Sequence, residues 1–141
     1  MIEQLLPVHP KLVHFPIALF STALILDILG RIFRKENLHE AAVVMYVGAA
    51  LFTPIVVWAG LWEQQRLHLH HPVLDQHKLY AWGTMWLSLI SLPVLWLVKK
   101  RSLKVFRIVF TSLLLCLGLL VTVTGYWGGK MVYEYGAGVS Q

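Results

Sequence analysis

The stretch "AAVVMYVGAALFTPIVVWAGLW", from Ala41 to Trp62, contains no charged residue. A helix rises 1.5 Å per residue and needs about 20 apolar residues to cross about 30 Å of hydrocarbon, so this stretch is long enough to span a membrane. Three further runs have a similar character: Phe15 to Ile32, Leu79 to Val98 and Leu103 to Thr124. The sequence therefore predicts an all-α polytopic membrane protein, a bundle of four transmembrane helices with short loops.

The composition supports this fold class. Of the 141 residues, 57% are hydrophobic and 13% are charged, far from the values typical of soluble domains. No linker or repeat divides the chain, which predicts a single domain over residues 1–141. Its spans are expected near residues 12–32, 41–62, 78–98 and 103–126, followed by a glycine-rich outer tail at 127–141. No nucleophile with a partnered base, phosphate loop or carboxylate pair is evident, so no catalytic activity of the chain alone is predicted.

The basic residues are distributed unevenly between the two sides of the predicted bundle. Eight lie in or beside the first and third loops: Arg31, Arg34, Lys35, Lys99, Lys100, Arg101, Lys104 and Arg107. The other side carries Lys11, Arg66, Lys78 and Lys130. Because basic residues favour the cytoplasmic side of membrane proteins, this bias predicts that both termini lie outside. The net charge of +5 is thus explained by topology, and nucleic acid is not expected as a partner.

Six of the seven histidines fall on the predicted outer side. They are His9, His14, His68, His70, His71 and His77, whereas His39 lies on the cytoplasmic side. Imidazole is the commonest metal ligand and a usual axial ligand of haem, so this grouping indicates a candidate cofactor site. The three loop histidines, at 68, 70 and 71, can equally be solvated residues of a polar connection.

His14 and His77 are the histidines that the sequence places best for such a site. His14 precedes Pro16, which is best tolerated in the first turn of a helix. His77 follows Asp75, an expected helix N-cap. Both imidazoles would then lie in first turns at equal depth and could face each other. Downstream of His77, the residues at helical spacing are Tyr80, Thr84, Ser88 and Ser91. This polar stripe is predicted to point into the bundle, where its hydroxyl groups find partners.

One acidic residue lies inside the first span. Asp27 is four residues before Arg31, near the cytoplasmic interface. An ion pair between residues i and i+4 of a helix accounts for its presence, so no proton relay is predicted.

The two ends of the chain carry paired motifs. "HPKLVHFPIAL", residues 9–19, and "GYWGGKMVYEYGAGV", residues 125–139, resemble the signatures of the bacterial membrane family known as domain of unknown function 2231. The resemblance implies a four-helix domain of the bacterial cytoplasmic membrane, joined in some larger proteins to c-type cytochrome modules. The matching positions are His9, Pro10, His14, Pro16, His77, Gly128, Gly129, Val132, Tyr133, Gly136 and Gly138. Tyr135 stands where relatives often carry histidine.

Three functions are compatible with these features. The first is binding of haem b for electron transfer, with His14 and His77 as axial ligands and His9, Tyr80 and Tyr133 completing the pocket. A c-type cytochrome or another respiratory subunit would then be the redox partner. The second is binding of zinc, copper or nickel at the outer face by His9 and His14 together with one or more of His70, His71 and His77. The third is a non-catalytic scaffold subunit of a larger complex, or a homo-oligomer, in the lipid bilayer.

Overall fold

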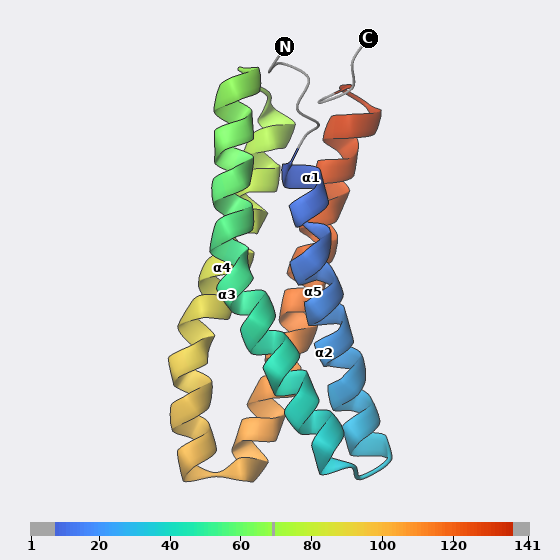
Figure 1. Cartoon of the computed structure of the whole chain (residues 1–141), viewed down its shortest axis with the longest axis vertical. Coiled ribbons are helices and arrows are strands. Elements are labelled where there is room, and N and C mark those ends of the chain that lie inside the picture. The colour runs from blue at the N-terminus through green and yellow to red at the C-terminus, as the bar shows by residue number, and fades with distance from the viewer. Residues whose placement is uncertain (1–7, 69, 137–141) are drawn as a thin grey trace.

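The computed structural model describes residues 8–68 and 70–136, and these fold into an all-α bundle (Figure 1). The helices are α1 (His9–Leu12), α2 (His14–Ile32), α3 (Glu36–Leu67), α4 (Pro72–Arg101) and α5 (Leu103–Tyr133). Only Val13 separates α1 from α2, and together they form one apolar segment, His9–Ile32. This segment and α3, α4 and α5 give four helices long and apolar enough to cross a membrane, which confirms the predicted fold class.

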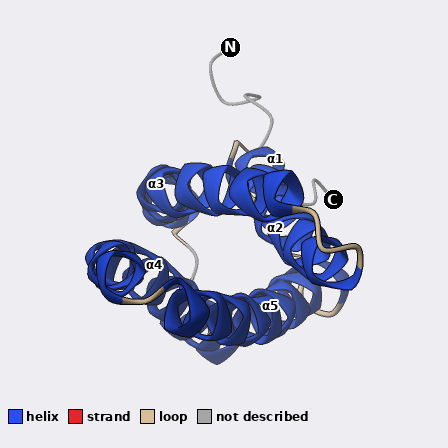
Figure 2. Cartoon of the chain, turned by 90° about the horizontal axis from the view of Figure 1, so that it is seen from below, coloured by secondary structure: helices blue, strands red, loops and turns tan. Residues whose placement is uncertain are grey.

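The helices form two hairpins. α2 packs mainly on α3, and α4 packs mainly on α5, with smaller contacts between the hairpins (Figure 2). The beginning of α1, the α3–α4 connection and the end of α5 lie at one end, which we call the terminal end (Figure 1). The α2–α3 and α4–α5 connections lie at the opposite end, which we call the hairpin end.

The core joins the hairpins around small and aromatic side chains. Ala23 of α2 and Ala42 and Ala49 of α3 are fully buried, so the backbones of these helices approach closely. Tyr46, also fully buried, packs edge-on against Phe110 of α5 at a centroid distance of 5.4 Å. Close packing therefore holds this part of the core together, since lipid provides no hydrophobic driving force between helices.

The predicted polar stripe of α4 does face the bundle. Ser88 is fully buried and Thr84 is nearly so. The Tyr46 hydroxyl donates to the carbonyl oxygen of Ser88 at 3.0 Å and also bonds the hydroxyl of Ser91. These hydroxyl residues thus connect α3 with α4 through hydrogen bonds.

Several helix boundaries differ from the expected spans; α3, for example, extends five residues beyond 41–62 at each end. α4 begins at Pro72 with His71 as its N-cap, because proline suits the first helical position and the His71 ring accepts the Val73 amide at 3.2 Å. His77 therefore lies in the second turn, and Asp75 is inside the helix and is not its cap. The structure also extends α5 to Tyr133, through part of the predicted tail 127–141. Residues 137–141 of that tail lie outside the described residues.

Candidate functional site

Two histidines meet at the terminal end of the bundle. His9 is the first residue of α1, and His77 belongs to α4. Their ring centroids are 6.0 Å apart, and the ring planes make an angle of 86°. The chain thus brings imidazoles from both hairpins to one place, as the sequence predicts for the outer histidines, but the partner of His77 is His9.

The two imidazoles are held in the same way. His9 Nδ1 lies 3.0 Å from the carbonyl oxygen of Val56 in α3, and His77 Nδ1 lies 2.9 Å from the carbonyl oxygen of Thr124 in α5. A carbonyl oxygen only accepts, so Nδ1 of each ring is the protonated donor. In each neutral ring the Nε2 atom then keeps its lone pair, which is the tautomer that a metal-binding histidine requires.

Glycines make room for both rings. A Cβ atom at Gly60 of α3 would lie 2.8 Å from Cε1 of His9. A Cβ atom at Gly128 of α5 would lie 3.3 Å from Cε1 of His77. The first distance is too short for any side chain, so His9 can lie against α3 only because residue 60 is glycine. Gly128, one of the positions shared with the resembling family, allows the corresponding approach of His77 to α5.

Glu63 adds the principal acidic group to the site. Its side chain is largely buried, and Oε2 accepts the backbone N–H of His9 at 3.2 Å. This bond satisfies an amide at the beginning of α1, where no intrahelical carbonyl is available. Glu63 therefore fixes the backbone that carries the first imidazole.

The pair borders a cavity of about 620 Å³. Cavities that hold small ligands usually measure about 300–1,000 Å³, so this volume suits an organic cofactor. Most of the wall is apolar and is contributed by both hairpins, with Val57, Leu61, Leu74, Ala81 and Val121 among its residues. The site thus combines paired imidazoles with a low-dielectric surrounding.

The other predicted site residues take different positions. His14 lies on the cavity wall but is exposed, and within the described ranges it has no ring contact with His77. Tyr133 also borders the cavity and is 90% exposed. Tyr80 is half-buried in α4 and does not border the cavity. The structure therefore brings His14 and Tyr133 to the site's edge and leaves Tyr80 outside it.

The loop histidines make local contacts. The His70 ring bonds the carbonyl oxygen of His68 at 3.0 Å. The His71 ring packs on Tyr135 at a centroid distance of 4.1 Å, in addition to capping α4. Among residues 8–68 and 70–136, no group of three or more His, Cys, Asp or Glu side chains is placed to hold a metal ion. The structure thus does not gather the five predicted metal ligands into one cluster.

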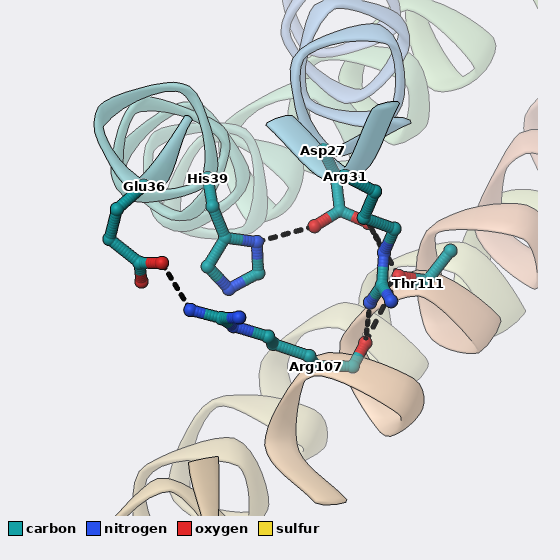
Figure 3. Close-up of polar contacts among 6 residues, drawn as sticks. All are labelled: Asp27, Arg31, Glu36, His39, Arg107 and Thr111. Atoms are coloured by element: carbon teal, nitrogen blue, oxygen red, sulfur yellow. Dashed lines mark hydrogen bonds and ion pairs between the residues drawn. The ribbon is translucent and has the colours of Figure 1, made fainter. Parts of the chain in front are cut away.

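Sequence reasoning missed a second polar cluster, at the hairpin end (Figure 3). The predicted ion pair between Asp27 and Arg31 is present at 3.3 Å, but it does not account for the carboxylate alone. His39 Nδ1 lies 2.5 Å from Asp27 Oδ1, and the Thr111 hydroxyl donates to Oδ2. Asp27 is completely buried. Its carboxylate is bound by Arg31 of α2, His39 of α3 and Thr111 of α5. The sequence signal was weak, because His39 and Asp27 lie on different helices.

The comparisons with known proteins give one result. The family model described as "Predicted membrane protein (DUF2231)" matches residues 5–141, which is nearly the whole chain and includes both terminal motifs. No curated protein and no solved structure matches the sequence. Because the family model matches nearly the whole chain, and the structure has four helices long and apolar enough to cross a membrane, the chain belongs to the DUF2231 family of predicted membrane proteins.

Proposed function

We propose that the protein binds one haem b at the terminal end of the bundle, where His9 and His77 would hold its iron, and that it serves in electron transfer. The observation that carries this proposal is the orientation of the two imidazoles. Each is fixed through Nδ1 by a backbone carbonyl, and each keeps Nε2 for a metal.

The donor set fits a haem iron. The ring centroids are 6.0 Å apart beside one cavity, so both imidazoles would lie within reach of one bound group. Two ligands suffice for haem, since the porphyrin supplies the remaining bonds, whereas a structural zinc site needs four. The absence of a three-residue cluster among the described residues therefore favours haem over a free metal ion.

The surroundings fit a porphyrin as well. The cavity of about 620 Å³ has mostly apolar walls, which suit a flat hydrophobic macrocycle. Lys78 and Lys130 belong to the same end of α4 and α5, and Lys78 borders the cavity. Their ammonium groups pair with Asp75 and Glu134 in the structure, and they have the sign that a haem propionate would need.

The residues of the chain would act on such a group in defined ways. Haem supplies one-electron exchange when it is bound. The carbonyls of Val56 and Thr124 orient the imidazoles and make them more basic ligands, which favours the oxidised state of a bound iron. The apolar wall excludes water, which favours the less charged state. The protein thereby has two separate means of setting a redox potential.

The membrane arrangement of this proposal follows from charge. The hairpin end carries the larger number of basic residues, so we place it in the cytoplasm and the terminal end on the outer side of the bacterial cytoplasmic membrane. The site would then be open to an outer redox partner such as a c-type cytochrome.

A porphyrin and metal assay tests the proposal. The full chain is produced with an adequate haem supply, purified in mild detergent and analysed for iron, zinc, copper, nickel and extractable porphyrin. We expect iron and haem b in equal amounts, near one per chain. A stoichiometric metal without porphyrin would contradict the haem proposal and would support binding of a free metal ion. Protein that contains neither a metal nor a porphyrin would contradict both the haem function and the small-metal function, and the scaffold role would remain.

A further inference from the structure

A second cavity, of about 480 Å³, lies at the hairpin end of the bundle. It lies at the other end of the bundle from the histidine pair, and it is lined mainly by charged residues, whereas the first cavity is lined mainly by apolar ones. Four basic side chains border it together with Glu36 and His39: Arg31, Arg34, Lys35 and Arg107. Such an accumulation of positive charge in a hollow attracts anions.

The positive charge of the cavity is only partly compensated. Arg31 pairs with the buried Asp27, and Arg107 pairs with Glu36 (Figure 3). Among the described residues, no ion pair is formed by Arg34 or Lys35. Two cationic side chains are therefore available to a ligand.

Arg34 occupies an unusual backbone position. Its φ angle is 52°, in the left-handed region that glycine favours after the end of a helix. For a residue with a Cβ atom this conformation is unfavourable by about 1 kcal/mol. Local backbone preference therefore does not explain an arginine at this position, which borders the cavity.

His39 supplies an independent indication of a ligand. Its side chain is 9% exposed, and Nδ1 is occupied by Asp27. Nε2 is buried and has no hydrogen-bond partner in the described part of the chain. Figure 3 shows this nitrogen on the edge of the ring that faces away from Asp27, toward Arg107. A buried polar atom without a partner is costly, and a ligand in the cavity would complete it.

The N-terminus of α3 borders the same cavity. Lys35 is its N-cap and offers no side-chain oxygen, so no side chain caps the helix. The first amide groups of a helix lack intrahelical acceptors and carry the positive end of the helix dipole. They add further donors for an anion.

We propose that this cavity binds a phosphate group, carried either by the headgroup of an anionic phospholipid or by a soluble phosphate compound. Arg34 and Lys35 neutralise its charge. His39, held through Nδ1 by Asp27, bonds the phosphate group through its buried Nε2. The cavity lies at the end of the spanning helices, at the depth of lipid headgroups, where basic pockets between helices recognise such groups. Several donors and two free charges suit phosphate better than a carboxylate.

The test uses the full chain, purified and delipidated in a neutral detergent. One arm measures binding of inorganic phosphate by equilibrium dialysis. The other measures retention of phosphatidylglycerol against phosphatidylcholine by native mass spectrometry. The informative variants are Arg34→Gly and Lys35→Gln. Glycine is favoured at a φ of 52°, so Arg34→Gly removes the charge without endangering the fold. The control is Lys104→Gln, which removes an exposed charge of the same end.

We expect Arg34→Gly and Lys35→Gln each to weaken binding by about tenfold, since charge-assisted hydrogen bonds are strong, while Lys104→Gln has little effect. Binding of inorganic phosphate would show that the cavity binds a soluble phosphate compound without a lipid. Selective retention of phosphatidylglycerol without phosphate binding identifies a lipid headgroup. The proposal is overturned if the wild-type chain shows neither, or if all three variants lose binding equally.

Discussion

The ring centroids of His9 and His77 lie 6.0 Å apart and the ring planes are nearly perpendicular, although the two residues belong to different hairpins of the bundle. Each ring is also bonded to a further helix, α3 or α5. A cofactor bound by both rings would therefore join the hairpins. Since a ligand that binds only the folded state stabilises it, removal of the cofactor should lower the melting temperature of the purified protein.

The glycine beside His9 gives a steric prediction. Gly60→Ala should displace the imidazole, because the new Cβ would lie 2.8 Å from Cε1 of His9. Overpacking of this kind costs about 1–3 kcal/mol of stability, and cofactor content should fall with it. Gly83→Ala is the matched control, since a Cβ there meets nothing within 4 Å. Thermal unfolding and cofactor content of both variants check this, and equal behaviour would refute the contact.

The buried carboxylate of Asp27 gives a prediction on stability. Asp27→Asn removes the charge that compensates Arg31 and contacts His39. Arg31 is 39% exposed and can be solvated, so the loss comes mainly from the charge-assisted hydrogen bonds of the buried carboxylate and is about 1.5–3 kcal/mol. Glu36→Gln serves as the control, because Glu36 and Arg107 are exposed and such pairs contribute at most about 1 kcal/mol. Denaturant unfolding of the two variants should differ strongly, and a small loss in Asp27→Asn would contradict the network.

The hydrogen bond between α3 and α4 can be removed with little change of shape. Tyr46→Phe deletes the hydroxyl that donates to the Ser88 carbonyl and should lower stability by about 1 kcal/mol. Tyr126→Phe is its counterpart at a side chain that is 59% exposed, where we expect almost no change. Melting temperatures in the same detergent compare the two. A larger loss at Tyr126 would show that the buried bond is unimportant.

The predicted orientation can be read from chemical labelling. In a Cys116→Ala background, His68→Cys places a thiol at the terminal end and Lys104→Cys places one at the hairpin end. We expect a membrane-impermeant maleimide to label the first from outside intact cells and the second only after permeabilisation, because basic residues concentrate at the hairpin end. The opposite labelling pattern would contradict the predicted orientation and would place the hairpin end outside.

Much of the fold could be predicted from the sequence, because hydrophobic length alone specifies spanning helices. The polar stripe of α4 was also predictable, since Thr84 and Ser88 recur at helical spacing and are buried. Helix ends were less accessible. Pro72 at the first helical position and His71 as N-cap begin α4 six residues before the expected span, which hydrophobic length does not reveal.

The site could be predicted only in outline. The charge bias and the positions of the histidines predicted His9, His14 and His77 at one end of the bundle, and the structure places all three beside one cavity. The pairing depends on tertiary contacts, because Gly60 and the Val56 carbonyl fix His9 from a different helix. The hairpin-end cluster was hidden for the same reason, since Asp27 meets His39 only when α2 packs on α3.

The central claim, haem bound between His9 and His77, is tested most directly by the reduced-minus-oxidised absorption spectrum of the purified protein. The wild-type chain is compared with His9→Ala, His77→Ala and the control His68→Ala, a histidine of the same end outside the pair. We predict a b-type spectrum with a Soret shift in the wild type and in His68→Ala, and its loss in the other two variants. An unchanged spectrum in His9→Ala and His77→Ala, or no Soret band in wild-type protein made with adequate haem, would contradict the account.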